Sequence, residues 1–251
     1  NTWALHNKKH LSSSMEHHSI SPYFRVSPEV DGILNTEFVK SILNNHTYKW
    51  GQPIDVLSCM YVNNELGTIQ PVNELARVAH DNNAMFHTDA VQAYGQIPID
   101  VNELNIDMLS ASGHKLNGPK GIGFLYIRKG LKLRSFIHGG AQERKRRAGT
   151  ENVPGIVGFG KACELAANQL EEHQEKLSSI RDELIDKVLS TIPEAHVNGD
   201  MENRLPNLVN FRFKAIEGES LILLLDAKGY QASTGSACSS NKLEASPVLT
   251  A

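Results

Sequence analysis

Residues 110–121 read SASGHKLNGPKG and follow the apolar residues Ile106, Met108 and Leu109. The apolar run predicts a buried strand, so Lys115 stands just beyond a strand end, between small residues and a Gly-Pro turn. Glycines let the backbone approach a ligand closely, and a lysine in such a place can be desolvated and become an amine nucleophile. Schiff-base chemistry on a phosphate-bearing cofactor is one interpretation, and a polar turn that closes a strand is the other.

Alternating extended and helical patterns surround this stretch. Apolar runs predict strands at residues 56–62, 84–88, 106–111 and 122–127, with a further extended run at 133–137 and a helical pattern around Leu75. Strands separated by helices indicate an α/β fold with a mostly parallel central sheet covered by helices. Ligands of such sheets bind at the carboxyl ends of the strands. Because Asn64, Asp89 and Lys115 all follow predicted strands, we expect them to converge on one crevice.

The second half of the chain has a different composition. A helical pattern rich in Glu, Leu, Lys and Ala covers residues 156–192, and a strand at 208–213 and a helix at 221–225 follow it. We therefore expect a large cofactor-binding domain at residues 1–153, a bridging helix at 154–192 and a small α+β domain at 193–251. The chain starts in a pattern typical of the middle of a helix and ends early in the small domain, so we expect truncation at both ends.

Composition excludes several classes of protein. The 251 residues are 40% hydrophobic and 21% charged, as in soluble globular proteins, and the net charge of −3 argues against a direct nucleic-acid partner. No apolar run is long enough to span a membrane, and the histidines and cysteines show no metal-binding spacing. Cysteine usage without a disulfide pattern favours a cytoplasmic location. Cys59 and Cys163 lie in apolar or helical runs, whereas Cys238 stands among the small residues TGSACSS, where a thiol is accessible.

Four further side chains fit a Schiff-base lysine. A carboxylate at a strand end, such as Asp89, is commonly a cap or an ion-pair partner, but beside a pyridine ring it would keep the ring nitrogen protonated. Asn64 and Gln92 could donate hydrogen bonds to an oxygen on the same ring. His17 could stack on the ring or carry a proton, a structural or exposed histidine is the alternative, and the neighbouring His18 competes for the role.

Six segments, in chain order, carry a family resemblance: MEHHS, YVNNELG, HTDAVQ, SASGHKLNGPKGIG, HGGAQERKRRAGT and STGSACSS. They resemble the successive motifs of the pyridoxal-phosphate-dependent cysteine desulfurases, in the iron–sulfur-cluster and nitrogen-fixation branch of the class V aminotransferase superfamily. The resemblance covers nearly the whole chain. It implies a fold-type-I transferase with pyridoxal 5'-phosphate as cofactor, which converts L-cysteine to L-alanine and leaves the sulfur on an enzyme cysteine as a persulfide.

The same resemblance implies the catalytic residues. Lys115 would form the Schiff base with the cofactor, Cys238 would accept the sulfur, and His17 would stack on the ring. The persulfide would then pass to a sulfur-acceptor protein, either an iron–sulfur scaffold or a tRNA-thiolating enzyme.

Cofactor contacts follow from the matching motifs. By resemblance, Asp89 would pair with the ring nitrogen, while Asn64 and Gln92 would contact the ring oxygen, with Asn64 also near the substrate carboxylate. Ser112 and His114 would bind the phosphate.

The resemblance further implies a homodimer in which Thr150 reaches the phosphate of the other subunit. Two other enzymatic interpretations stay open from sequence, a selenocysteine lyase and a class V aminotransferase, and Cys238 distinguishes them because a transaminase needs no nucleophilic thiol there. An alternative of another class is a truncated, non-catalytic dimerisation or docking module.

Overall fold

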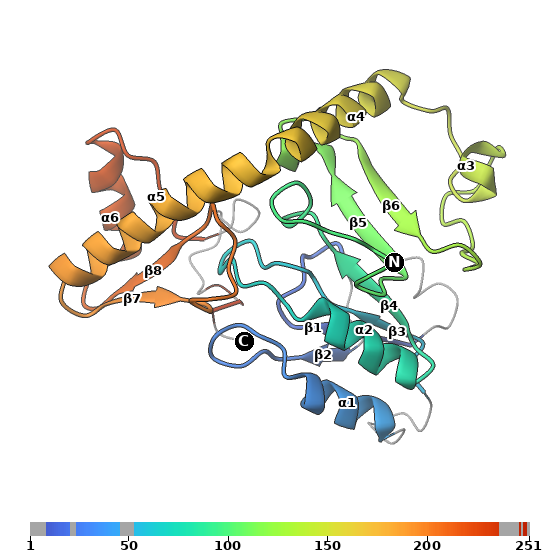
Figure 1. Cartoon of the computed structure of the whole chain (residues 1–251), viewed down its shortest axis with the longest axis horizontal. Coiled ribbons are helices and arrows are strands. Elements are labelled where there is room, and N and C mark those ends of the chain that lie inside the picture. Colours follow the sequence, from blue (N-terminus) through green and yellow to red (C-terminus); the bar gives the residue numbers. More distant parts are fainter. Residues whose placement is uncertain (1–8, 21–23, 46–52, 236–245, 247, 250–251) are drawn as a thin grey trace.

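A six-stranded sheet forms the centre of the computed structural model, which describes residues 9–20, 24–45, 53–235, 246 and 248–249. The strand order is β2-β1-β3-β4-β5-β6, and neighbouring strands are parallel except for the antiparallel pair β5–β6 (Figure 1). The bounds are β1 (His10–Ser13), β2 (Phe24–Val26), β3 (Val56–Ser58), β4 (Met85–Asp89), β5 (Met108–Ser112) and β6 (Gly123–Ile127). The predicted α/β fold with a mostly parallel sheet is therefore confirmed.

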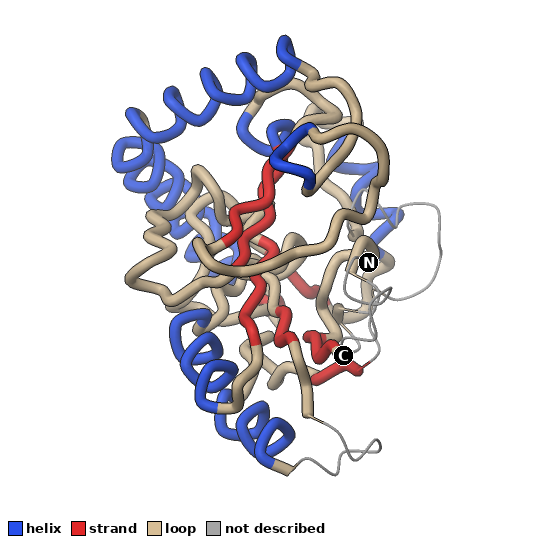
Figure 2. The backbone as a smooth tube through the Cα atoms, turned by 90° about the vertical axis from the view of Figure 1, so that its right-hand side faces the viewer, coloured by secondary structure: helices blue, strands red, loops and turns tan. Residues whose placement is uncertain are grey.

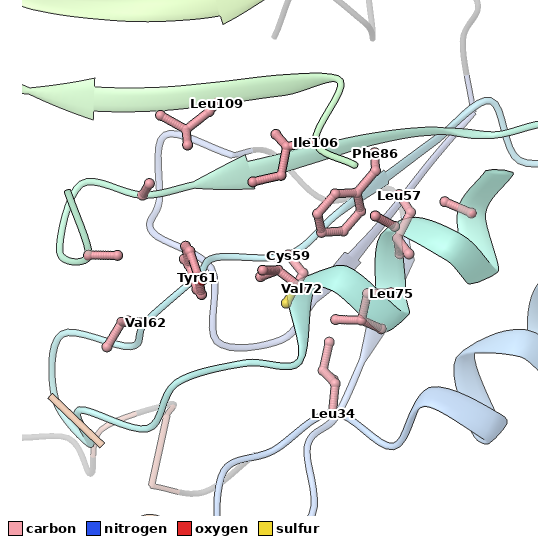
Figure 3. Packing of buried hydrophobic residues seen from close by; sticks show 14 of the residues in the cluster. Leu34, Leu57, Cys59, Tyr61, Val62, Val72, Leu75, Phe86, Ile106 and Leu109 are labelled. Carbon is pink, nitrogen blue, oxygen red and sulfur yellow. The ribbon is translucent and has the colours of Figure 1, made fainter. Parts of the chain in front are cut away.

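Two amphipathic helices pack beside this sheet. Helices α1 (Thr36–Asn44) and α2 (Val72–Asp81) contact each other, and α2 also contacts β3 and β4. Leu75 lies on the buried face of α2, and Figure 3 shows it near Leu57 and Phe86, which are at most 1% exposed. Removal of these apolar side chains from water is the main force that holds helix and sheet together.

A long helical rod leads away from the sheet (Figures 1 and 2). Helix α4 (Val153–Asn168) begins at Asn152, whose side chain accepts a hydrogen bond from the backbone N–H of Gly155, and Gln169 separates α4 from α5 (Leu170–Thr191). The rod ends at a two-stranded antiparallel sheet of β7 (Ala195–Asn198) and β8 (Asn210–Phe213), which is followed by α6 (Gly218–Asp226). The helix predicted at 156–192 is thus two consecutive helices.

Several local expectations differ from the structure. The strand predicted at 56–62 ends at Ser58, because the backbone N–H of Met60 bonds the Glu16 side chain instead of continuing the ladder with β1. Residues 133–137 form no strand, since β6 is the last strand of the sheet and the segment runs over the surface. His10, at the end of the stretch that resembles a helix, begins strand β1.

Within the described part of the chain, no helix combines the length and apolar character that a membrane crossing requires.

Candidate active site

Most candidate residues lie at one edge of the sheet. Strands β1, β3, β4 and β5 run parallel, so their carboxyl ends meet at the same edge. The segments after these ends carry the predicted side chains of His17, Asn64, Asp89, Gln92, Ser112, His114 and Lys115. The structure therefore places these residues at or just beyond the same edge of the sheet.

Asp89 ends β4 and is only 8% exposed. Its Oδ1 accepts a hydrogen bond from the backbone N–H of Val91 at 2.9 Å, whereas Oδ2 accepts none from the described residues. Desolvation by burial raises the pKa of Asp89, while the Val91 N–H and the charge of His17 act in the opposite direction. Asp89 thus has one oxygen available for a ligand cation or N–H donor.

His17 follows β1 and has an exposed side chain. Its Nδ1 lies 2.9 Å from the Ser19 hydroxyl and accepts the backbone N–H of Ser19 at 3.2 Å. The His17 and His18 rings are 5.5 Å apart and tilted by 42°. The electrostatic interaction of His17 with Asp89 favours His17 over His18 as the histidine of this site.

Lys115 lies in a single 3₁₀ turn, Gly113–Leu116, that directly follows β5. Asn117 closes the turn in the left-handed conformation with φ of 58°, and the backbone N–H of Gly118 donates to the carbonyl of Gly113 at 2.9 Å. A Cβ on Gly118 would lie 2.9 Å from that carbonyl oxygen, so this glycine permits contact between two backbone segments. The glycine explains the shape of the turn without any ligand.

The side chain of Lys115 is exposed to solvent. The interpretation that this lysine is desolvated is therefore wrong for this chain. The turn buries Leu116, at 8% exposed, and leaves His114 and Lys115 facing outward beyond the sheet edge. The Lys115 amine is therefore accessible to a molecule that binds at this edge of the sheet.

Ser112 and His114 form a polar pair on the same turn. The Ser112 Oγ lies 2.7 Å from the Nδ1 of His114. With the serine hydroxyl donating to Nδ1, the Nε2–H of the exposed ring is free to donate to an anion. This geometry suits the phosphate role that the resemblance implies.

Asn64 and Gln92 are half-buried, and neither side chain forms a hydrogen bond with the described residues. Asn63 instead holds the loop, because its Oδ1 accepts the backbone N–H groups of Glu65 at 2.8 Å and Leu66 at 3.0 Å. A helical turn after Asp89, in which the N–H of Tyr94 donates to the carbonyl of Ala90 at 2.8 Å, carries Gln92. Both side-chain amides remain available.

The loop that presents Asn64 is joined to a distant part of the chain. The backbone N–H of Ile69 donates to the Asn203 carbonyl at 2.8 Å, and that of Leu205 donates to the Gly67 carbonyl at 2.9 Å. The guanidinium of buried Arg204 donates to the Leu66 carbonyl at 3.4 Å. Sequence reasoning missed Arg204, since a charged side chain in a polar loop gives no signal of burial.

Two predicted residues stand apart from this group. Cys238 belongs to residues 236–245, which lie outside the described part of the chain. The chain returns nearby at Ser246, whose hydroxyl donates to the Glu65 carboxylate at 2.5 Å, and at Val248, which packs against Met15. Thr150 is exposed between α3 (Gln142–Lys145) and α4, and no contact joins it to the other candidates in the described structure.

Two buried titratable residues beneath the site were also missed. His87 bonds the Ser58 hydroxyl at 2.8 Å and the Ser110 hydroxyl at 2.9 Å. Desolvation and then the charge of His10 lower its pKa from 6.5 to about 3, so this imidazole stays neutral. Glu16 directly precedes His17, and that adjacency was the only sequence signal that could have drawn attention to it.

The chain is similar in sequence to known cysteine desulfurases. The chain is 52% identical to the cysteine desulfurase IscS of Methanosarcina thermophila, over 97% of its own length and 61% of the relative. It is 47% identical to the cysteine desulfurase NifS of Azotobacter vinelandii, over 88% of its length and 53% of that relative. The chain therefore spans less than two thirds of the length of these relatives.

Solved structures show the same fold. A NifS-like protein superposes with a TM-score of 0.81 and 34% identity, over 93% of this chain and 67% of that one. The protein SspA, solved in complex with cysteine, superposes with a TM-score of 0.75 and 32% identity, over 98% of this chain and 70% of that one. The profile of the family described as aminotransferase class-V matches residues 2–249. The chain belongs to the class V aminotransferase family, and its close relatives are IscS and NifS cysteine desulfurases.

Proposed function

We propose that this chain carries the cofactor site of a cysteine desulfurase, which converts L-cysteine to L-alanine and transfers the sulfur to Cys238 as a persulfide. One observation carries the proposal: Asp89, with an open carboxylate oxygen, and Lys115, with an exposed amine, follow the carboxyl ends of the paired strands β4 and β5. The similarity to cysteine desulfurases supports the choice of reaction.

The residues present fit pyridoxal 5'-phosphate. The Oδ2 of the buried residue Asp89 can accept the N–H of a pyridinium ring, and the amides of Asn64 and Gln92 have donors available for the ring oxygen. With Ser112 bonded to Nδ1, the Nε2–H of His114 is available as a donor to a phosphate, on the turn that carries Lys115. When bound, pyridoxal phosphate supplies an electron sink for the electrons released at the substrate carbon.

The chain's own residues would divide the work. Lys115 would hold the cofactor through its amine and would hold or deliver a proton at Nζ. Asp89 keeps the ring nitrogen protonated, and His17 covers the ring. Asn64 orients the substrate carboxylate.

Cys238 performs the sulfur transfer in this proposal. Its thiolate attacks the sulfur of bound cysteine, so an S–S bond forms while the substrate C–S bond breaks. The electron pair of the broken bond remains with the carbon, which gains a proton and leaves as alanine. Ser246, which follows Cys238 in the sequence, donates a hydrogen bond to Glu65 in the loop that carries Asn64.

A homodimer and a sulfur-acceptor protein complete the proposal. Hydrophobic side chains at the start of α4 are exposed, with Val153 at 59%, Ile156 at 44% and Val157 at 65%, close in sequence to Thr150. A second copy that covers this surface would bring Thr150 to the partner's phosphate site. The acceptor would be an iron–sulfur scaffold or a tRNA-thiolating enzyme in the cytoplasm, and cysteine as substrate is supported by the similarity to SspA.

The purified chain tests the proposal directly. We expect the visible absorbance of lysine-bound pyridoxal phosphate in the wild type, its loss in Lys115→Ala, and its retention in the matched control Lys120→Ala, an exposed lysine between this turn and β6. Cys238→Ser should keep the spectral response to cysteine but release neither sulfide nor alanine, whereas Cys163→Ser should behave as wild type. Sulfide release by Cys238→Ser would overturn the assignment of the acceptor.

A further inference from the structure

Glu16 has a carboxyl group with two unequal oxygens. Its Oε1 accepts two hydrogen bonds, from the Ser13 hydroxyl at 2.7 Å and from the backbone N–H of Met60 at 2.6 Å. Its Oε2 is buried and has no hydrogen-bond partner among the described residues. A negatively charged oxygen that is buried without a hydrogen-bond donor lowers the stability of the fold. A protonated Oε2 carries no charge and avoids most of this cost. The geometry therefore suits a neutral carboxylic acid.

The surrounding charges point the same way. Desolvation raises the pKa of Glu16 from 4.5 to about 8, against the two hydrogen bonds from Ser13 and Met60, and the charge of Asp89 raises it further. The other titratable neighbour is the thiol of Cys59, whose pKa is raised by burial and by Glu16. The raised pKa of Glu16 and its buried, unpartnered Oε2 both favour a proton on this carboxyl group. A protonated Glu16 adds no negative charge beside Asp89.

The Met60 hydrogen bond also ties two strand ends together. Glu16 lies after β1 and Met60 lies after β3, where the ladder between these strands has ended. His17 is the next residue, so the Glu16 anchor fixes the backbone that carries His17, whose charge acts on the pKa of Asp89.

We propose that Glu16 is a positioning residue that works as a neutral carboxylic acid, holding the His17 backbone against Met60 and sparing Asp89 a second negative charge. This inference rests on the proposed function, because His17 and Asp89 are the groups expected to hold the cofactor ring. Its first half concerns the protein alone and can be tested without a cofactor.

Carboxyl carbon NMR of the chain with labelled glutamate measures the protonation state. One glutamate should titrate near pH 8, and that signal should be missing in Glu16→Gln. The matched control Glu172→Gln, on the exposed face of α5, should leave the signal near pH 8 in place. If every glutamate titrates in the ordinary range, the neutral acid is refuted, whether or not pyridoxal phosphate binds.

Equilibrium binding of pyridoxal phosphate tests the positioning role. Glu16→Gln retains the acceptor oxygen and the neutral charge, so its affinity at pH 7 should stay within about twofold of the wild type. Glu16→Ala removes both hydrogen bonds and should bind about tenfold more weakly. Above pH 8 the wild type should lose affinity and Glu16→Gln should not, because only the wild type gains a charge beside Asp89.

Two binding results would overturn the positioning role. Wild-type affinity in Glu16→Ala would show that the anchor has no influence, and a defect in Glu16→Gln as large as that of Glu16→Ala would show that the ionised form is required. If the wild type itself binds no pyridoxal phosphate, the proposed function fails, while the NMR titration still decides the state of Glu16.

Discussion

Glu16 and His87 give the free energy of unfolding a specific dependence on pH. The folded chain holds the pKa of Glu16 at about 8 against 4.5, so the unfolded chain loses this proton first and stability falls as the pH rises from 4.5 to 8. The pKa of His87 is about 3 against 6.5, so only the unfolded chain binds this proton and stability falls as the pH drops from 6.5 to 3. Each contribution is about 1.4 kcal/mol per pH unit, or about 5 kcal/mol over its whole interval.

Between pH 4.5 and 6.5 the two slopes have opposite signs and nearly cancel. These two groups alone therefore predict a plateau there, a loss of about 2 kcal/mol from pH 6.5 to 8, and a similar loss from pH 4.5 to 3. Urea unfolding followed by circular dichroism measures the free energy at each pH. The difference between wild type and variant isolates one group, because the other carboxyl and histidine titrations are common to both proteins.

Glu16→Gln should remove the loss of unfolding free energy that occurs as the pH rises, and it should keep the loss that occurs as the pH falls below 6.5. His87→Gln should keep the loss at rising pH and remove the loss at falling pH. His87→Gln also loses a hydrogen bond, which lowers the whole curve by about 1 kcal/mol without changing its slope above pH 6.5. Difference curves that run flat from pH 4.5 to 8 for Glu16→Gln, or from pH 3 to 6.5 for His87→Gln, would refute the reasoning.

Three substitutions test the packing that supports the site by urea unfolding at pH 7. Gly158→Ala should destabilise the chain by about 1–3 kcal/mol, because the new Cβ would lie 2.6 Å from the Cγ of Pro119, which follows Lys115 in the same loop. An unchanged midpoint of urea unfolding would contradict this contact. Gly160→Ala, two residues along the same helix, meets nothing within 4 Å and should stabilise the chain by about 0.5–1 kcal/mol. Asp107→Ala should cost about 1–3 kcal/mol, because it leaves the buried backbone N–H of Phe86 without its acceptor, which lies 2.8 Å away; an unchanged midpoint would show that this hydrogen bond contributes little.

The sequence predicts the part of the site that depends on strand order. The strands that end at Asp89 and Ser112 contain apolar runs long enough to be predicted as strands. Because parallel strands have their carboxyl ends at the same edge of a sheet, the prediction then places Asp89 and Lys115 at one edge. Strand β1, by contrast, has the sequence HLSS, and all four residues are buried although three are polar. The backbone of β1 forms hydrogen bonds with a neighbouring strand on each side, which allows its polar residues to be buried. The spacing of apolar residues in the sequence does not reveal this pairing.

The predictions that the structure contradicts failed for similar reasons. The strand after residue 56 stops early because the Glu16 side chain, distant in sequence, takes the Met60 N–H. Lys115 is exposed because burial of one residue of a short turn, Leu116, leaves its neighbours outside. Such outcomes depend on which groups meet in space, and a single stretch of sequence does not contain them.

The hydrogen bonds between residues 65–69 and 198–210 imply an order of events during synthesis of the protein. All six strands of the large sheet lie before residue 128, so this sheet can form while the rest of the chain is still being translated. The loop that presents Asn64, however, obtains its bonds from Asn203, Arg204 and Leu205 only after that later segment has left the ribosome. A nascent chain that already displays Asp89 and Lys115 therefore lacks these contacts to the Asn64 loop, because they come from a segment that is translated after the whole sheet.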